Sequence, residues 1–587
     1  MMRSNSIYPT YAKGLLILFL VLTNNMGLAQ TKIEQIDELL STYEEYGQFN
    51  GSVLVSEEGK VLYKKGFGMA NMEWGIPNQP NTKHRLGSIT KQFTAMLVLQ
   101  LVAEGKLDLQ TSITTYLPDY PKASGDKITC HHLLTHTSGI PNYTSFPNFM
   151  ENESRTPYTP EEFLEKFAHK ALEFTPGENF NYSNSGYFLL GVIIEKLSGK
   201  TYEQMLQEKI FIPLDMKDSG YDNHAVILKN RATGYEKQGN NYVNSAYLDM
   251  TIPYAAGSMY STVEDLFKWD QALYTTKILP QEYLNMYFEP QISAWSNFNY
   301  AYGWMVGYNK IGNSTDSIYT IGHGGGINGF STYITRTTSN KSSIIILNNT
   351  GGAPLNDMTE AILAIIHGKG YDMPKQSVAD VVLAVIENKG IDEGISRFNE
   401  IKASKDHRLL EGEMNAIGYV LMRSDRLDEA NKIFHLILEE FPSSSNAYDS
   451  YAESLMQLGE NELAIKNYLK SVELNPDNQN GITALKKLGY DVSDLVKEVI
   501  VPNTILETYI GEYELQPGFT LTITLNENQL KAQATGQPTV DIFPKSETEF
   551  YLKVIDAQLV FNKNDTGEID SLTLFQGGQE MKGKRID

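Results

Sequence analysis

The chain has 587 residues, enough for about four domains of roughly 150 residues each. Its 49 Lys and Arg against 71 Asp and Glu give a formal charge of −22, and because such a surface repels phosphate backbones we expect no nucleic-acid partner. The 41% apolar fraction excludes global disorder, and the single cysteine, Cys130, excludes an intrachain disulfide and a Cys-rich metal cluster.

The first 29 residues have the pattern of a secretory signal peptide. Arg3 and Lys13 precede an apolar run, Leu15–Leu22, and the small-residue site Gly27–Ala29 follows. An uncleaved membrane anchor is the alternative, but the run is far shorter than the roughly 20 residues that a spanning helix needs. The sequence therefore predicts cleavage after Ala29 and a bacterial protein that is periplasmic or secreted, with no membrane span after cleavage.

Residues 31–370 are predicted to form an α/β domain built on one antiparallel sheet. Two short strands flank a hairpin turn at Glu58-Gly59, and three more strands come much later, each group with its own helix. A long, mostly helical insertion over about 75–310 separates the two groups. The predicted strands and helices cover 52–55, 61–63, 317–321, 330–336, 343–347, 33–43 and 358–366.

Residues 376–495 are predicted to be wholly helical and repetitive. Ala430, Phe434 and Pro442 recur as Ala, Tyr and Pro, each 34 residues later, which is the period of tetratricopeptide repeats. Because a stable stack needs about three units, the segment 378–404 is expected to act as a third unit or a cap. We expect such repeats to offer a docking surface for a protein partner.

Residues 503–587 change to a period of two, with turn residues between the runs, as in Thr520–Leu525 and Ser571–Phe575. This pattern predicts a small all-β domain, either a barrel or a sandwich. The expected fold class is therefore multidomain: an α/β domain with an inserted helical subdomain, an all-α repeat domain and an all-β domain.

The first chemical motif is Ser88-Ile-Thr-Lys91, followed by an apolar helical run. Residues three apart share a helix face, with β-carbons about 5–6 Å apart, so Lys91 can reach the Ser88 hydroxyl. A buried lysine has a lowered pKa and can accept a proton, and a serine at a helix start has its alkoxide stabilised. Ser124 and Lys127 have the same spacing, but they lie in a predicted loop, so Ser124 is interpreted as structural.

The second motif is Tyr182-Ser-Asn184. A phenol can move a proton between nucleophile and leaving group, and an amide can hold a substrate carbonyl and Lys91. Tyr-x-Asn is a common string that also starts at Tyr221, Tyr242 and Tyr283, so only its combination with the other motifs favours Tyr182.

The third motif is His323-Gly-Gly325-Gly326, at the end of a predicted strand. Glycines let a substrate lie against a strand edge, and Gly326 can offer a backbone N–H to an oxyanion. His323 can hold a substrate carboxylate or assist proton movement, whereas the alternative is a glycine-rich turn. An HGGG string also occurs in lipase-like α/β-hydrolases, but these require Gly-x-Ser-x-Gly, which the chain lacks.

The order Ser-x-x-Lys, Tyr-x-Asn, His-x-Gly resembles the serine β-lactamase and penicillin-binding protein superfamily over about 50–370. The flanking stretches, Arg85 to Lys91 and Leu133 to Gly139, are similar to its class C-type branch, which also holds D-alanyl-D-alanine carboxypeptidases, D-aminopeptidases and carboxylesterases. The C-terminal domain is similar to a β domain often appended to such hydrolases.

The resemblance implies a nucleophile at Ser88, a base or pKa-tuning partner at Lys91 and a general acid or base at Tyr182. Asn184 would position substrate and Lys91, and backbone N–H groups of Ser88 and Gly326 would form the oxyanion hole. Whether Lys91 or the tyrosine takes the first proton is left open. No cofactor and no metal are implied, and the expected substrate is a small peptide, an ester or a β-lactam-like molecule.

One departure concerns the third motif, where many members, notably true β-lactamases, have Lys and this chain has His323. An unperturbed histidine is mostly neutral near pH 7, so its grip on a β-lactam carboxylate is weaker. The sequence thus favours an exported peptidase or esterase over a dedicated β-lactamase. The rival from another class is a penicillin-binding sensor without efficient turnover.

Two further groups of residues receive a structural interpretation. His132 and His136 have ligand-like spacing beside Cys130 and His131, but the family uses this stretch without a metal. The aromatic side chains that can either wall a substrate pocket or belong to the core are Trp295, Tyr300, Tyr302 and Trp304.

Overall fold

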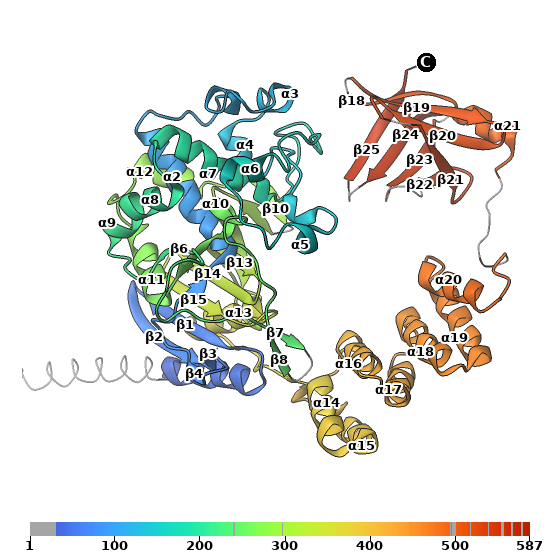
Figure 1. Cartoon of the computed structure of the whole chain (residues 1–587), viewed down its shortest axis with the longest axis horizontal. Coiled ribbons are helices and arrows are strands. Elements are labelled where there is room, and N and C mark those ends of the chain that lie inside the picture. Colours follow the sequence, from blue (N-terminus) through green and yellow to red (C-terminus); the bar gives the residue numbers. More distant parts are fainter. Residues whose placement is uncertain are drawn as a thin grey trace, which may run out of the picture. The chain divides into compact units, whose positions relative to one another are not determined.

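The computed structural model describes residues 31–586 except 239–240, 296, 494, 496–500, 517, 538, 553–556, 565–566 and 577–578 (Figure 1). The predicted signal peptide therefore lies outside the described residues. The chain forms two compact units, one ending at Leu410 and the other running from Glu411 to Asp587. In the described part of the chain, no helix is both long and apolar enough to cross a lipid bilayer.

The first unit is built on an eight-stranded antiparallel sheet, which confirms the predicted sheet. Its order is β10-β11-β12-β13-β14-β15-β1-β2, so the first strand pairs with the last, Gly51 opposite Asn348. The predicted hairpin turn is present at Glu58 and Gly59, both with positive φ. The strands are β1 (Gly51–Glu57), β2 (Lys60–Phe67), β10 (Ile292–Trp295), β11 (Phe298–Tyr300), β12 (Met305–Lys310), β13 (Ser317–Ile327), β14 (Phe330–Thr337) and β15 (Ser342–Asn348).

Three strands of this sheet, β10 to β12, fall inside the segment that was expected to be a mostly helical insertion. They are only three to six residues long; buried and exposed positions alternate in β10 over just four residues and do not alternate regularly in β11 or β12, so period-two patterning is too weak to reveal them. The insertion between strands of the sheet therefore ends near residue 291 instead of 310.

Each face of the sheet carries a separate hydrophobic core. Successive residues of β1 and β15 alternate between the two cores, because strand side chains point to opposite faces. The helical insertion covers one face (Leu54, Ile345 and Leu347). The helix over residues 31–45 and α13 (Leu355–Ile366) cover the other (Val53, Val55, Ile344 and Ile346).

The insertion is mainly helical, and its central helix α2 is buried at every position from Thr90 to Leu101. Its short strands are β3 (Met69–Asn71), β4 (Ile76–Pro77), β5 (His84–Arg85), β6 (Gly220–Tyr221), β7 (Tyr235–Gln238), β8 (Asn241–Asn244) and β9 (Met259–Ser261). Its α-helices are α2 (Thr90–Ala103), α3 (Lys122–Gly125), α4 (Cys130–Leu134), α5 (Phe149–Asn152), α6 (Pro160–Leu164), α7 (Asn184–Ser198), α8 (Tyr202–Leu206), α9 (Ile212–Leu214), α10 (Tyr254–Gly257), α11 (Val263–Ala272) and α12 (Gln281–Phe288).

The segment 378–404 forms α14 (Val378–Lys389) and α15 (Ile391–Ile401), which belong to the first compact unit. Lys237 of β7 contacts Asp380 of α14 at 2.7 Å, which ties this helix pair to the insertion. Two short strands, β16 (Gln376–Ser377) and β17 (His407–Arg408), pair beside it.

The second unit begins with five helices, and their starts repeat at the predicted interval. They are α16 (Glu411–Arg423), α17 (Leu427–Glu440), α18 (Ser445–Leu458), α19 (Asn461–Leu474) and α20 (Gln479–Lys487), so α18 and α19 each begin 34 residues after α16 and α17. A Cβ added at Gly418 would lie 2.4 Å from the Phe434 ring, so this glycine lets α16 and α17 approach closely. Their assignment as tetratricopeptide repeats stays a prediction.

The chain ends in a closed β-barrel, the first of the two alternatives predicted for the C-terminal domain. Pairing of Tyr513 with Arg585 joins the first strand to the last. The strands are β18 (Gly511–Gln516), β19 (Phe519–Asn526), β20 (Gln529–Ala534), β21 (Val540–Pro544), β22 (Glu549–Leu552), β23 (Ala557–Lys563), β24 (Ile569–Gln576) and β25 (Gln579–Arg585), preceded by α21 (Asn503–Leu506).

Candidate active site

Ser88 lies in a 3-10 turn, Gly87–Ile89, that leads directly into α2. Lys91 is the second residue of this helix, and its Nζ atom lies 3.0 Å from the Ser88 Oγ atom, as the three-residue spacing predicts. Ser88 is partly exposed, whereas the Lys91 side chain is fully buried. The partly exposed hydroxyl therefore lies at the positive end of a buried helix, with an amine behind it.

Lys91 is buried among uncharged partners. Besides Ser88, its Nζ atom contacts Asn184 Oδ1 at 2.8 Å and the carbonyl oxygen of Ala256 at 2.9 Å. Burial holds the pKa of this amine well below its ordinary value. A neutral amine has two N–H groups and one lone pair, which match two carbonyl acceptors and one hydroxyl donor. Lys91 can thus accept the Ser88 proton without losing a hydrogen bond.

Tyr182 stands over the same two groups. Its phenol is hydrogen-bonded to the Ser88 side chain, and the Lys91 Nζ atom lies 4.9 Å from its ring centroid. Burial raises the pKa of the phenol, so this group is protonated at neutral pH. A protonated phenol beside the nucleophile can donate a proton to a departing group.

The Tyr182 ring is supported from behind by His136, a residue that the sequence assigned to a structural stretch. The two ring centroids are 4.2 Å apart, and His136 is buried with a φ of 58°. Its Nδ1 atom accepts a hydrogen bond from the backbone N–H of Ser183 at 3.1 Å. Burial lowers the pKa of this imidazole well below its usual value, so the ring is neutral.

Asn184 opens α7, and Asn142 orients it. The Oδ1 atom of Asn142 accepts hydrogen bonds from the backbone N–H of Asn184 at 3.1 Å and from its Nδ2 atom at 3.3 Å. This arrangement turns the Asn184 carbonyl oxygen toward Lys91. Sequence reasoning missed both Asn142 and the Ala256 carbonyl, since a lone asparagine and a backbone oxygen carry no motif.

His323 lies in β13 and its ring is buried near Tyr182, with ring centroids 6.2 Å apart. Its Nδ1 atom is 2.6 Å from the carbonyl oxygen of Gly324, so Nδ1 carries the hydrogen and Nε2 accepts from the Tyr300 hydroxyl at 3.0 Å. Burial, reinforced by Lys91, lowers the pKa of His323 to about 4. A role in holding a substrate carboxylate, which stays a prediction, requires these internal bonds to be exchanged.

The glycines after His323 form an open strand edge against the Ser88 turn. Strand β12 pairs with β13 only as far as Gly322, so the following residues have a neighbour on the β14 side alone. A Cβ added at Gly325 would lie 1.9 Å from the Leu86 carbonyl oxygen, whereas one added at Gly326 meets nothing within 4 Å. Gly325 thus allows the turn to pack closely, and Gly326 faces open space where a substrate can lie.

The residues that were interpreted as structural have internal partners. Ser124 was expected in a loop but lies in the short helix α3, where its hydroxyl donates to the Pro121 carbonyl oxygen at 3.2 Å, while Lys127 lies beyond the helix and is exposed. His131 contacts the Tyr302 hydroxyl at 2.8 Å, and His132 closes a capping box with Thr129 at the start of α4. Their hydrogen bonds therefore give each of these side chains a structural role.

The four aromatic residues divide between wall and core. Tyr300 touches the site through His323, and Trp295, which is 45% exposed, lies 6.4 Å from Tyr182 between ring centroids. Trp304 is fully buried against Tyr287.

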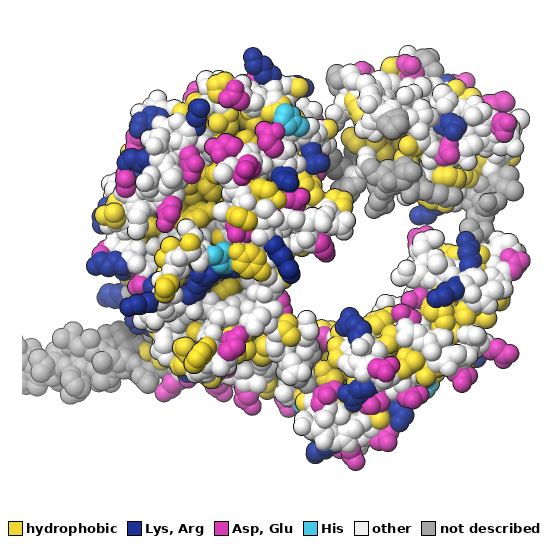
Figure 2. Space-filling view, viewed as in Figure 1, with side chains coloured by type: hydrophobic (Ala, Val, Ile, Leu, Met, Phe, Trp, Pro, Cys, Tyr) yellow, Lys and Arg dark blue, Asp and Glu magenta, His cyan; other side chains and the backbone are white. Residues whose placement is uncertain are grey.

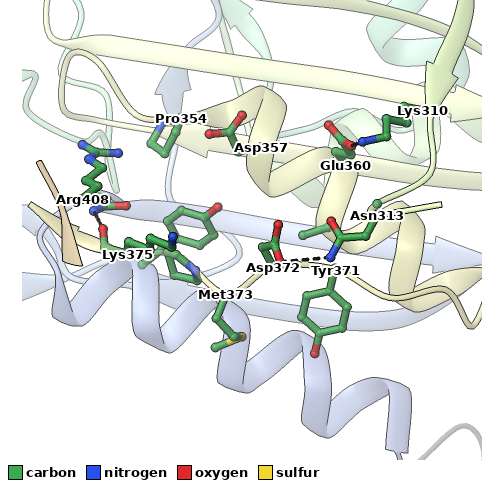
Figure 3. A pocket seen from close by; sticks show the side chains of 15 residues that line it. Lys310, Asn313, Pro354, Asp357, Glu360, Tyr371, Asp372, Met373, Lys375 and Arg408 are labelled. Carbon is green, nitrogen blue, oxygen red and sulfur yellow. Dashed lines mark hydrogen bonds and ion pairs between the residues drawn. The ribbon is translucent and has the colours of Figure 1, made fainter. Parts of the chain in front are cut away.

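A surface pocket of about 350 Å³ lies behind the opposite face of the sheet, beside α13 (Figure 3). Two pairs of its polar side chains contact each other: Asn313 donates to Asp372 at 3.0 Å, and Lys310 lies 4.0 Å from Glu360. None of the motif residues lines it. The chemistry of the three motifs is therefore confined to the face that carries the helical insertion.

Comparison with known proteins agrees with this geometry. The family model described as Beta-lactamase matches residues 33–367. The chain belongs to the β-lactamase family. A second model, described as Domain of unknown function (DUF3471), matches residues 496–585 and so covers the barrel.

Several relatives of this β-lactamase-family chain have printed names. It is 31% identical over 373 residues to "Penicillin-binding protein 4*" of Bacillus subtilis, covering 60% of this chain and 79% of that protein. A penicillin-binding protein from Bacillus halodurans shares 26% identity, with a TM-score of 0.50 over 56% of this chain and 99% of that one. The structure of D-amino acid amidase from Ochrobactrum anthropi SV3, complexed with L-phenylalanine amide, also shares 26% identity with this chain. Its TM-score is 0.50, and the match covers 58% of this chain and 99% of that one.

Proposed function

We propose that the protein is an exported serine hydrolase that cleaves an amide or ester through an acyl-enzyme on Ser88. The observation that carries this proposal is the setting of Lys91, whose amine is buried among uncharged partners 3.0 Å from the Ser88 hydroxyl. A lysine that only stabilised the fold would be placed more favourably beside a carboxylate or in water. Its burial instead favours the neutral form that a general base needs.

Each step of the reaction has a group in place. Neutral Lys91 takes the proton of Ser88, whose oxygen forms a bond to the substrate carbonyl carbon, and the N–H groups of Ser88 and Gly326 receive the oxyanion. When the bond to the leaving group breaks, the Tyr182 phenol donates its proton to that group and recovers one from Lys91. Water then attacks the acyl carbon and gives one proton to Lys91, which is again neutral. The ester bond to Ser88 breaks, and that proton passes to the serine oxygen.

The substrate class is proposed to be a D-amino-acid peptide, a peptidoglycan-type peptide or a small ester. The names of the relatives, a penicillin-binding protein and a D-amino acid amidase, support it. His323 supports it as well, because a neutral imidazole with both nitrogens bonded inside the protein offers no fixed positive charge to a β-lactam carboxylate. The peptidase and esterase types are therefore favoured over a true β-lactamase.

The remaining modules are given proposed roles. Export to a bacterial periplasm or medium rests on the predicted signal peptide, residues 1–29. The repeated helices over 411–487 are proposed to dock a protein partner, and the barrel is proposed to gate or orient the active site.

A fluorophosphonate or penicillin probe followed by mass mapping tests the nucleophile. We expect one adduct, on the peptide that contains Ser88, and its loss in Ser88→Ala. The matched control is Ser124→Ala, which removes the other serine of the same spacing and should label normally. A label on Ser124 would overturn the assignment.

Turnover separates the hydrolase from the sensor. With an ester or D-amino-acid amide in excess, a hydrolase releases many equivalents of product, while a sensor stops after one equivalent and keeps the acyl group. Stoichiometric acylation without release, seen with all three substrate classes, would replace the hydrolase by the penicillin-binding sensor.

A further inference from the structure

A second cavity, of about 300 Å³, lies on the same unit near the end of β13. The segments 231–234 and 244–248 form its walls, together with Arg85, His224 and the Phe330 ring. Arg85 and Arg231 bring the fixed charges, and no carboxylate is among its described lining residues. This is a basic pocket on a protein whose formal charge is −22 and whose visible surface in Figure 2 mixes both signs.

The two arginines are held by one carboxylate behind the pocket. Asp222, whose side chain is 1% exposed, contacts Arg85 Nε at 2.7 Å and Arg231 Nη1 at 3.2 Å. Two guanidinium groups thus share one carboxylate, while the carboxylate of Asp249 accepts a hydrogen bond from the Tyr247 hydroxyl of the pocket wall. Each guanidinium has five N–H donors in a fixed fork, and Asp222 occupies only part of them. Besides its contact with Asp222, Arg85 has its Nη2 atom 3.4 Å from His224 Nε2. A guanidinium group with N–H donors left over is well suited to bind a second carboxylate.

The pocket is connected to the reaction centre through two elements. Arg85 comes three residues before Ser88, in the segment whose Leu86 carbonyl accepts from Thr332 of β14 at 2.8 Å. Phe330 pairs with Ile327 just beyond the glycine edge, and it lies on the same sheet face as Thr332, two residues away. The pocket thus lies past Gly326, at the opposite end of the edge from His323.

The position of the proton donor, Tyr182, indicates which part of the substrate reaches this pocket. Tyr182 serves the leaving group and lies close to His323, at the start of the glycine edge. A substrate bound along the edge therefore places its leaving group at His323 and its acyl group toward Ile327. The Asn328 Nδ2 atom donates to the Ala246 carbonyl oxygen at 2.8 Å, which fixes the strand turn to the pocket wall.

We propose that this cavity is an acyl-side subsite that binds a carboxylate through Arg85 and Arg231. The substrate class is then an amide or ester whose acyl part ends in a carboxylate. This inference rests on the proposed function for its direction along the edge, but the carboxylate site itself can be tested without turnover.

The kinetic test compares two esters of matched length, 4-nitrophenyl pentanoate and 4-nitrophenyl hydrogen glutarate, which differ in a terminal carboxylate. In the full chain, Arg231→Gln should lower kcat/KM for the glutarate ester about tenfold, since a charge-assisted hydrogen bond is worth more than 1 kcal/mol. The kcat/KM for the pentanoate ester should fall much less, because that ester has no terminal carboxylate to bind, and Arg231→Lys should retain part of the preference for the glutarate ester. The control Arg397→Gln removes the same charge from an exposed site on α15 and should change neither.

Binding of free glutarate, followed by titration calorimetry, supplies an arm that does not depend on catalysis. Wild type and Ser88→Ala should bind it, and Arg231→Gln should bind it about tenfold more weakly. The subsite is overturned if Arg231→Gln hydrolyses both esters with the same ratio of kcat/KM values as wild type, whether or not both values fall. If neither ester is hydrolysed, the proposed function fails, and the titration alone decides the carboxylate site: no glutarate binding by wild type overturns it.

Discussion

The Oδ1 atom of Asn184 lies 2.8 Å from the Nζ atom of Lys91, although the residues are 93 positions apart in the chain. The contact joins the starts of two buried helices, α2 and α7, and it does so with an uncharged group. An amide satisfies the amine without stabilising its positive form as a carboxylate would. The low pKa of Lys91 therefore depends on the neutrality of this partner as much as on burial.

Asn184→Asp tests this dependence. A carboxylate beside Lys91 favours the ammonium form and raises the pKa of the amine by about one to two units. Because the reaction needs neutral Lys91, kcat/KM rises as pH rises through that pKa. The acidic limb of the pH profile should therefore move to higher pH in the variant, as measured with a neutral ester.

Asn184→Ala is the matched control for that experiment. It also removes the amide but adds no charge, so its activity should fall without an upward displacement of the acidic limb. If the acidic limb of kcat/KM lies at the same pH in wild type and in Asn184→Asp, then Lys91 does not titrate as the base.

A pair of glycine variants separates packing from the substrate edge. Gly325→Ala places a methyl group 1.9 Å from the Leu86 carbonyl oxygen, so it should cost about 1–3 kcal/mol of unfolding free energy. Gly326→Ala meets no protein atom within 4 Å and should fold normally. Its methyl group enters the space where the substrate lies, so kcat/KM should fall. Denaturant unfolding and ester hydrolysis measure the two effects, and normal activity in Gly326→Ala would argue against this edge as the binding surface.

How far the sequence predicted this site depends on how local each contact is. Ser88 and Lys91 were paired correctly because a three-residue spacing on a helix brings two side chains together whatever the rest of the chain does. Tyr182 and Asn184 depended on the family resemblance, since a Tyr-x-Asn string by itself is common. The sheet was predicted from the strand pattern, two strands early in the chain and three late, and its first and last strands do pair across almost the whole domain.

The contacts that the sequence did not reveal are those made by backbone atoms or by single polar residues far away in the chain. The Ala256 carbonyl holds Lys91 but has no side-chain signature, and Asn142 orients Asn184 through one oxygen. The His323 motif was recognised, yet its bond to Tyr300 is long-range and fixes a tautomer that no pattern encodes. Strands β10 to β12 were missed because segments of three to six residues are too short for a period of two to stand out.

His136 is predicted to act as a positioning residue for Tyr182. His136→Asn suits the positive φ of 58°, since asparagine tolerates this region, but it removes the ring that lies 4.2 Å from Tyr182. A less fixed phenol should lower kcat about ten- to hundredfold, with a smaller effect on KM. Steady-state kinetics measure the split. His132→Asn, which changes a histidine that caps α4 and has no contact with Tyr182, is the control; a pure loss of stability with unchanged kcat would leave His136 a structural residue.

Buried histidines should also make the fold sensitive to acid, and His84 allows this to be measured away from the nucleophile. Its side chain is fully buried in β5, where Nδ1 donates to the Thr82 carbonyl oxygen at 3.0 Å, and burial lowers its pKa to about 4. Above pH 6.5 the ring is neutral in both the folded and the unfolded chain. As pH falls from about 6.5 to 4, the unfolded chain takes up a proton that the folded chain refuses, so the unfolding free energy falls.

His84→Phe keeps an aromatic ring in contact range of Phe330, 6.3 Å away between centroids, and removes the titration. Between pH 7.5 and pH 5, wild type should lose about 2 kcal/mol more unfolding free energy than this variant, the amount set by a pKa displaced from about 6.5 to 4. Denaturant unfolding at the two pH values gives the loss of unfolding free energy for each protein. Because only these losses are compared, any cost of the substitution that does not depend on pH cancels. His323 and His136 remain in the variant, so part of the acid sensitivity should persist. Equal losses in both proteins would mean that His84 takes up its proton without unfolding the chain.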